Sequence, residues 1–86
     1  MKNKQIWVRI RFFAAPREAL GTGEIEREIP AGTTAGGLVD LLAEEYPALR
    51  PYARYLSVAV NRVYVELQTS LHDGDEVACL PPVGGG

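Results

Sequence analysis

The 86-residue sequence contains one cysteine, one histidine and no long apolar run. The lone Cys79 cannot form a disulfide within the chain, which argues against a disulfide-stabilised secreted scaffold. No uninterrupted hydrophobic stretch exceeds four residues, whereas a membrane-spanning helix needs roughly 20. The basic start at residues 1–4 is not followed by the apolar segment of a signal peptide. These absences predict a cytoplasmic protein with no membrane contact.

An excess of charge of either sign is also missing. Nine Lys and Arg against eleven Asp and Glu leave a formal net charge of −2. This balance provides no broad attraction to phosphate backbones, so no nucleic-acid partner is expected. With 47% hydrophobic and 23% charged residues, the composition is that of one folded globular domain.

Residues that bind metals or phosphates are few. His72 has no companion at metal-ligand spacing, so no metal site is predicted. The acidic residues at 73–76 do not match a calcium-binding loop and are assigned to a turn. Gly32 and Gly36-Gly37 lack the Gly-Lys-Ser/Thr that completes a phosphate-binding loop. The sequence therefore predicts no bound cofactor.

Two periodic segments define the first half of the chain. Alternation from Ile6 to Phe13 predicts a strand whose even-numbered residues face the core. After a turn over 14–23, with at most one helical turn, residues 24–29 predict a second strand that pairs with the first as a hairpin. Apolar spacings of three and four over 35–46 then predict a helix.

The ends of that helix are marked by particular residues. Thr33 and Thr34 are candidate N-caps, and Pro47 provides the stop. Gly36 and Gly37 fall in the first turn, where each costs up to about 1 kcal/mol relative to alanine. We interpret them as permitting a close approach of the helix to the sheet, and the alternative is a frayed helix end.

The second half is predicted to be irregular over 48–55 and then to contain three short strands. Asn61-Arg62 and Asp73-Gly74 are turn residues between these strands. The strands are 56–60, 63–67 and 75–80. One main helix covering one face of a mixed sheet predicts an α+β, ubiquitin-like β-grasp domain over residues 1–80.

The last six residues, Pro81–Gly86, cannot continue a sheet, because proline lacks an amide donor and glycine loses much entropy on ordering. Residues 81–86 are expected to form a flexible tail that reaches roughly 20 Å when extended. The proposed reactive group is the terminal carboxylate on Gly86, since glycines without Cβ can thread a narrow channel. A carboxylate is ionised at pH 7 and needs activation, for instance as an anhydride with AMP. The alternative is a terminus without function.

These segments together resemble the MoaD/ThiS family of ubiquitin-like sulfur carriers, most closely the small subunits of molybdopterin synthase. The resemblance covers nearly the whole chain. The matching segments are Phe12-Phe13-Ala14, Arg17–Gly21, Thr34 with Leu38, Leu42 and Tyr46-Pro47, Val60-Asn61-Arg62, Asp73–Ala78, Pro81-Pro82-Val83 and Gly85-Gly86.

The resemblance implies a cycle of activation and transfer. An ATP-dependent activating enzyme would adenylate Gly86, and a sulfur donor system would replace AMP to leave a thiocarboxylate. The large synthase subunit, in a heterotetramer, would then transfer the sulfur to cyclic pyranopterin monophosphate. ATP would be used by the activating partner, and the carrier would have no catalytic pocket of its own. Gly85 and Gly86 would be catalytic, and the partner would bind Pro81, Pro82, Val83 and Gly84.

Other assignments stay open. Within the fold, the chain could carry sulfur for thiamine, thiolated tRNA or cysteine synthesis, or act as a modifier joined to lysines. From a different class, it could be a β-grasp interaction domain whose tail is inactive. Cys79 is interpreted as a small core residue and not as a sulfur acceptor, since buried thiols are inert.

A partner-binding surface is predicted at the root of the tail. If the first and last strands are neighbours, Phe13, Tyr64 and Leu80 could form an exposed apolar patch there. Arg17 and Arg11 would flank it and pair with acidic groups of a partner. The alternative is a set of scattered surface aromatics.

Overall fold

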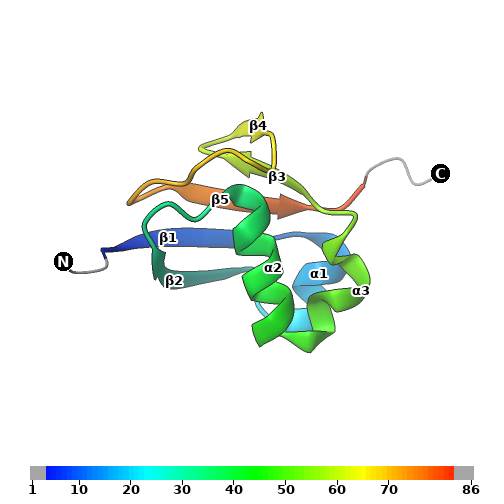
Figure 1. Cartoon of the computed structure of the whole chain (residues 1–86). Coiled ribbons are helices and arrows are strands. Elements are labelled where there is room, and N and C mark those ends of the chain that lie inside the picture. The colour runs from blue at the N-terminus through cyan, green and yellow to red at the C-terminus, as the bar shows by residue number, and fades with distance from the viewer. Residues whose placement is uncertain (1–3, 83–86) are drawn as a thin grey trace.

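The computed structural model describes residues 4–82 and contains a five-stranded sheet with one long helix across a face (Figure 1). The strands are β1 (Gln5–Phe12), β2 (Glu24–Pro30), β3 (Ser57–Val60), β4 (Val63–Val65) and β5 (Glu76–Leu80). The helices are α1 (Ala14–Leu20), α2 (Ala35–Glu45), the 3-10 turn η1 (Pro47–Leu49) and α3 (Arg50–Ala53).

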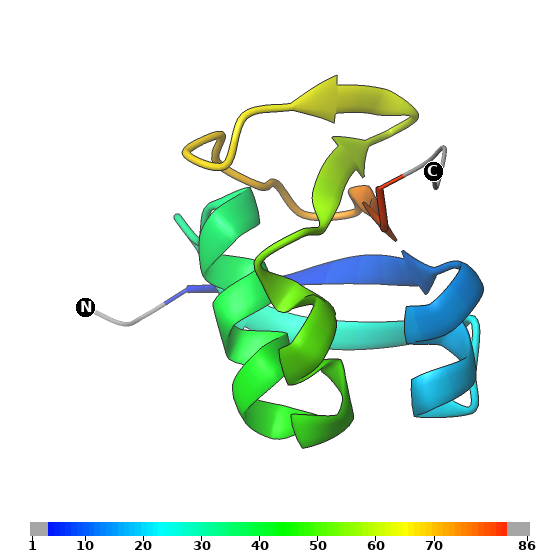
Figure 2. The same cartoon turned by 90° about the vertical axis from the view of Figure 1, so that its right-hand side faces the viewer.

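The sheet is mixed, with strand order β2-β1-β5-β3-β4. β1 runs parallel to β5, while the β1–β2, β3–β5 and β3–β4 pairs are antiparallel. The first and last strands are therefore neighbours at the centre of the sheet. Figure 2 shows α3 folded back beside α2. This arrangement is the ubiquitin-like β-grasp fold, and the predicted fold class is confirmed.

The alternating sequence of β1 produces its two faces. Val8, Ile10 and Phe12 are buried, whereas the odd-numbered Arg9 and Arg11 between them are exposed. The buried residues pack against Leu38 and other apolar residues of α2. The predicted strand and its core-facing side are confirmed.

The ends of α2 are fixed by side chains. Thr34 caps the helix, because its Oγ1 accepts a hydrogen bond from the amide of Gly37 at 3.0 Å. Near the other end, the guanidinium of Arg27 on β2 donates to the Glu45 carboxylate at 2.6 Å and to the Tyr46 hydroxyl at 3.2 Å. The carboxylate and its hydrogen bond raise the pKa of Arg27 above its ordinary value. The helix is thereby capped at its start and attached to β2 near its end.

Gly36 permits a close approach, but to the loop after β4 and not, as its position in the sequence had suggested, to the sheet. Its amide donates to the carbonyl oxygen of Leu67 at 2.8 Å. A Cβ at this position would lie 3.1 Å from the Leu67 Cβ and 3.2 Å from that carbonyl oxygen. The loop after β4 therefore packs directly on the first turn of α2, at a place where an added Cβ would require Leu67 to shift by a few tenths of an ångström.

Replacement of Gly36 by alanine is expected to destabilise the fold. Alanine favours a helix by up to about 1 kcal/mol, but the new Cβ must displace the Leu67 backbone. We expect the free energy of unfolding to fall by about 1–3 kcal/mol, measured by urea denaturation. Glu44→Ala, at an exposed position of α2, is the control and should stay within about 0.5 kcal/mol. Equal stability of Gly36→Ala and the unaltered chain would contradict the close approach.

Two segments predicted to be turns or irregular are helical. Residues 14–20 form α1, and residues 47–53 form η1 followed by α3. Pro16, Pro47 and Pro51 each lie in the first turn of a helix. There the missing amide has no intrahelical partner to lose. Buried Pro16 and Leu49 then hold these short helices against the core.

The turns that orient the last strands follow the prediction. Asn61 and Arg62 have φ angles of 51° and 73°, both in the left-handed region that a two-residue hairpin turn requires. The Asn61 side chain also accepts from the Glu76 amide and donates to an Asp75 carboxylate oxygen, each at 3.0 Å. β4 ends at Val65, two residues before the predicted end.

Candidate functional site

One face of the sheet carries α2, and the other face is left uncovered by the described residues. The strand registers assign the side chains of this open face. They are Trp7, Arg9, Arg11, Glu24, Glu26, Glu28, Ala59, Tyr64, Glu76 and Ala78, with Phe13 and Leu80 continuing the alternation of β1 and β5.

The C-terminal segment leaves from the centre of the sheet. Pro81 and Pro82 follow β5, which lies between β1 and β3, and Leu80 lies opposite Ser57 of β3 (Figure 1). Pro81 is half-buried and Pro82 is exposed. Val83, Gly84, Gly85 and Gly86, to which the sequence assigns the reactive tail, lie outside the described residues.

The three predicted patch residues share the open face. Tyr64 is 66% exposed, and Phe13 and Leu80 are half-buried. Tyr64 is the cross-strand neighbour of Ala59, which is in turn paired with Ala78, so small side chains separate it from Phe13 and Leu80. We call these five residues the tail-root patch. Ala78 and Phe13 line one hollow of about 210 Å³ together with Arg11, Arg62 and Glu76.

The two arginines expected to flank the patch differ in their contacts. Arg11 pairs with Glu76 at 3.3 Å and with Glu24 at 4.0 Å, and its guanidinium lies 5.6 Å from the centre of the Phe13 ring. Arg11 is therefore already engaged within the chain, and its pairing with acidic groups of a partner stays a prediction. Arg17 lies beside the patch against Gly23, where an added Cβ would be 3.1 Å from its Nε. Within residues 4–82 it forms no ion pair.

Cys79 is a core residue on the face of β5 that meets α2. Its side chain is fully buried, and burial raises the pKa of the thiol from 9.0 to about 12. The thiolate is the nucleophilic form, so this cysteine is shielded from reaction. The structure agrees with its interpretation as a packing residue.

Alkylation measures this shielding directly. At pH 8 the pKa shift lowers the thiolate fraction from about one in ten to about one in 10⁴. We expect iodoacetamide to modify Cys79 in the folded chain at least about 10³-fold more slowly than in urea, followed by mass. Similar rates in the two states would show that the thiol is accessible. The same shift leaves stability unaffected below pH 9, where the thiol is protonated in both states, and destabilises the fold as the pH rises from 9 toward 12.

One open-face feature was missed at the sequence level. Trp7 is 52% exposed and borders a second hollow near the start of β1. The available signal was the position of this large aromatic on the side of β1 opposite its aliphatic residues. The predicted partner surface includes only residues near the tail root.

The described part of the chain contains neither a membrane-spanning helix nor a group of metal ligands. In residues 4–82, no helix is both long and apolar enough to cross a bilayer. In the same residues, no three His, Cys, Asp or Glu side chains are grouped to hold a metal ion.

The fold and the position of the tail root define a ubiquitin-like β-grasp protein. The family model described as "ThiS family" matches residues 10–86. The chain belongs to this family, and its resemblance to the MoaD/ThiS carriers is confirmed.

Three known proteins give the match more detail. The molybdopterin synthase sulfur carrier subunit of Mycobacterium tuberculosis is 45% identical over 82 residues, with 94% of this chain and 99% of the relative covered. Small archaeal modifier protein 3 of Haloferax volcanii is 31% identical over 92% of this chain and 98% of its own length. A Helicobacter pylori structure of subunits 1 and 2 of molybdopterin-converting factor in complex includes a chain with a TM-score of 0.68 and 27% identity, covering 94% of this chain and all of that one.

Proposed function

We propose that this chain is the sulfur carrier subunit of molybdopterin synthase. The observation that carries the proposal is the 45% identity to such a subunit over 94% of this chain and 99% of the relative. The Helicobacter pylori complex of subunits 1 and 2 supports a large-subunit partner for a chain of this fold. The proposed site is the carboxylate of Gly86, presented by a tail that leaves the centre of the sheet.

The chemistry has three balanced steps. A carboxylate oxygen of Gly86 attacks the α-phosphorus of ATP on the activating enzyme, which forms the acyl adenylate and releases pyrophosphate. Hydrosulfide from the donor system attacks the acyl carbon and expels AMP, which leaves a thiocarboxylate and a proton. On the large subunit, the thiocarboxylate sulfur bonds to a carbon of cyclic pyranopterin monophosphate and displaces the oxygen substituent of that carbon. Water then cleaves the acyl–sulfur bond, which restores the Gly86 carboxylate and leaves a thiolate on the pterin. Because the activation step uses ATP, the proposed cycle takes place in the cytoplasm.

The structure supports a division of labour between carrier and partner. The open face carries apolar side chains beside the tail root, and Arg17 adds a cation next to them. Burial of such a patch stabilises a complex, while the unpaired cation favours an acidic partner surface. The tail-root patch would hold the partner while Pro81–Gly84 direct Gly85-Gly86 toward the partner's pocket.

Product formation tests the proposal. Thiocarboxylated carrier would be mixed with the purified large subunit and cyclic pyranopterin monophosphate, and the dithiolene product would be followed by mass spectrometry. The proposal predicts product formation with about two carriers consumed per product. A carrier that loads sulfur but yields no product would overturn the molybdopterin assignment and favour another sulfur acceptor.

A second function in the same fold is protein modification. The 31% identity to small archaeal modifier protein 3 over 92% of this chain favours it. A modifier would join the Gly86 carbonyl to a lysine amine with loss of AMP from the adenylate. Because no Lys or Arg follows Arg62, trypsin would leave residues 63–86 attached to the modified lysine. Mass spectrometry of digested lysates would then find this remnant on lysines, and it should disappear when Gly86 is deleted.

A further inference from the structure

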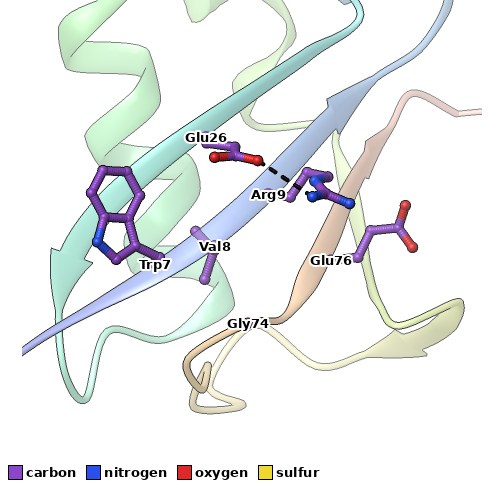
Figure 3. Close-up of a pocket in the computed structure, with 6 residues that line it drawn as sticks. All are labelled: Trp7, Val8, Arg9, Glu26, Gly74 and Glu76. Carbon is purple, nitrogen blue, oxygen red and sulfur yellow. Dashed lines mark hydrogen bonds and ion pairs between the residues drawn. The ribbon is translucent and has the colours of Figure 1, made fainter.

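A second hollow lies on the open face, at the end of the sheet away from the tail-root patch. Its volume is about 190 Å³, and Figure 3 shows the residues that line it. They are Trp7, Val8, Arg9, Glu26, Gly74 and Glu76. We call it the Trp7 hollow. Phe13 lies six positions after Trp7 in the sequence, which is a distance of about 20 Å in extended chain.

The backbone of Trp7 is held rigidly beneath an exposed side chain. Its amide donates to a carboxylate oxygen of Asp73, and its carbonyl oxygen accepts from the amide of Gly74, each at 2.7 Å. The indole itself is 52% exposed. A large aromatic on a fixed backbone loses little conformational entropy when a partner covers it. Such residues often carry binding energy at interfaces.

The charges around this indole are unbalanced. Arg9 pairs with Glu24 at 3.1 Å and with Glu26 at 3.3 Å (Figure 3). Glu28, directly opposite Trp7 in the β1–β2 register, forms no ion pair within residues 4–82. The open faces of β1, β2 and β5 carry four glutamates against two arginines, which is an excess of two negative charges. They are Glu24, Glu26, Glu28 and Glu76 against Arg9 and Arg11.

The indole also lacks a cation of its own. In the described part of the chain, the cation–π contact is that of Arg11 with Phe13. An aromatic face attracts a guanidinium or ammonium group, and a nearby carboxylate strengthens the attraction. An exposed indole beside an unpaired glutamate therefore complements a basic side chain.

We propose that Trp7, at the edge of this hollow, and its cross-strand neighbour Glu28 together bind an arginine or lysine side chain of the large subunit, stacked on the indole and paired with the carboxylate. This inference rests on the proposed function, because it assigns the basic residue to the protein that takes up the tail. A standard interface buries about 800 Å² on each partner, a footprint roughly 28 Å across. One partner seated on the tail-root patch would therefore also reach a hollow about 20 Å away.

We expect the hollow to contribute to the selectivity for one partner and to take no part in the sulfur transfer. A contact of this kind tunes the affinity for one partner while the tail carries out the reaction.

Binding measurements with the full-length chain and the purified large subunit test the inference. Trp7→Ala and Glu28→Gln are each expected to raise the Kd about 5- to 20-fold, and Glu28→Gln should also weaken the salt dependence. Tyr55→Ala and Glu44→Gln are the matched controls, because Tyr55 is 58% exposed and neither residue lies on the open face. Both controls should bind as the unaltered chain does.

A spectroscopic signal checks the contact itself. Trp7 is the single tryptophan, so a carrier grown with 5-fluorotryptophan has one fluorine resonance, which should shift when unlabelled large subunit binds. Unchanged affinities of both variants together with an unshifted resonance would overturn the inference and leave the proposed function intact. Failure of the unaltered chain to bind the large subunit would overturn both.

Discussion

Deletion of Gly86 is expected to abolish sulfur loading and transfer while leaving the fold unchanged. The deletion withdraws the carboxylate by one residue, about 3.5 Å. A misplacement of about 1 Å at a reacting group already costs about 100-fold in rate. We therefore expect thiocarboxylate formation with the activating enzyme, ATP and a sulfide source to fall by more than 100-fold. Intact-protein mass spectrometry measures it.

Two tail variants complete this experiment. Addition of one residue after Gly86 should be equally inactive, because it moves the carboxylate beyond the reacting position. Gly84→Ala keeps the tail length and both terminal glycines, so it is the control and should retain loading. A deletion variant that loads sulfur normally would contradict the assignment of the reactive group and favour an interaction domain.

Truncation of the tail-root patch is the second prediction with a large effect. Leu80→Ala and Phe13→Ala should each weaken binding of the large subunit about 10- to 100-fold, measured by calorimetry, because half-buried apolar side chains at the centre of an interface carry much of its energy. Both side chains lie on the open face and outside the buried core. The folded state should therefore persist, which circular dichroism can verify.

Val63→Ala is the matched control for the patch. Val63 is 63% exposed on β4, but its register opposite Val60 assigns it to the other face of the sheet. Its truncation should leave the Kd unchanged. Equal affinities of Leu80→Ala, Phe13→Ala and Val63→Ala would show that the partner does not bind the patch.

The main elements could be predicted because local pattern and tertiary environment agree. The alternation of β1 matches a strand covered on one side, and the spacings of three and four in α2 match a helix packed on a sheet. Asn61-Arg62 marked a turn because asparagine tolerates a positive φ. In each case the local pattern and the surroundings provided by the rest of the fold favour the same structure.

The short helices could not be predicted in the same way. α1 and α3 contain seven and four residues, too few to be stable without tertiary packing. Their prolines favour a helical first turn and a turn equally well. The burial of Pro16 and Leu49 decides between the two, and burial depends on the whole fold.

The candidate site shows the same limit. The shared face of Phe13 and Leu80 followed from alternation once the first and last strands were neighbours. The ion pairs of Arg11 with Glu24 and Glu76 could not be predicted from this alternation, because they depend on the register of three strands. Cross-strand ion pairs are properties of pairing, and the charge pattern of a single strand does not specify them.

The open face divides into two regions with different expected roles. Near the tail root it is apolar, with alanines between the larger side chains. Farther along β1 it is charged, with Arg9 and Arg11 held by glutamates and Trp7 exposed. An apolar region contributes affinity by burial, and a charged region contributes selectivity and association rate. The two sets of variants would separate these contributions.

The most direct test of the central claim is the intact mass of the full-length chain after incubation with its activating enzyme, ATP and a sulfide source. The sulfur-carrier role predicts a mass increase equal to the replacement of one oxygen by sulfur, and fragmentation should locate this increase at Gly86. It also predicts loss of this increase when ATP is omitted. An unchanged carboxylate in the complete mixture, with an activating enzyme shown to be competent on another carrier, would contradict the account.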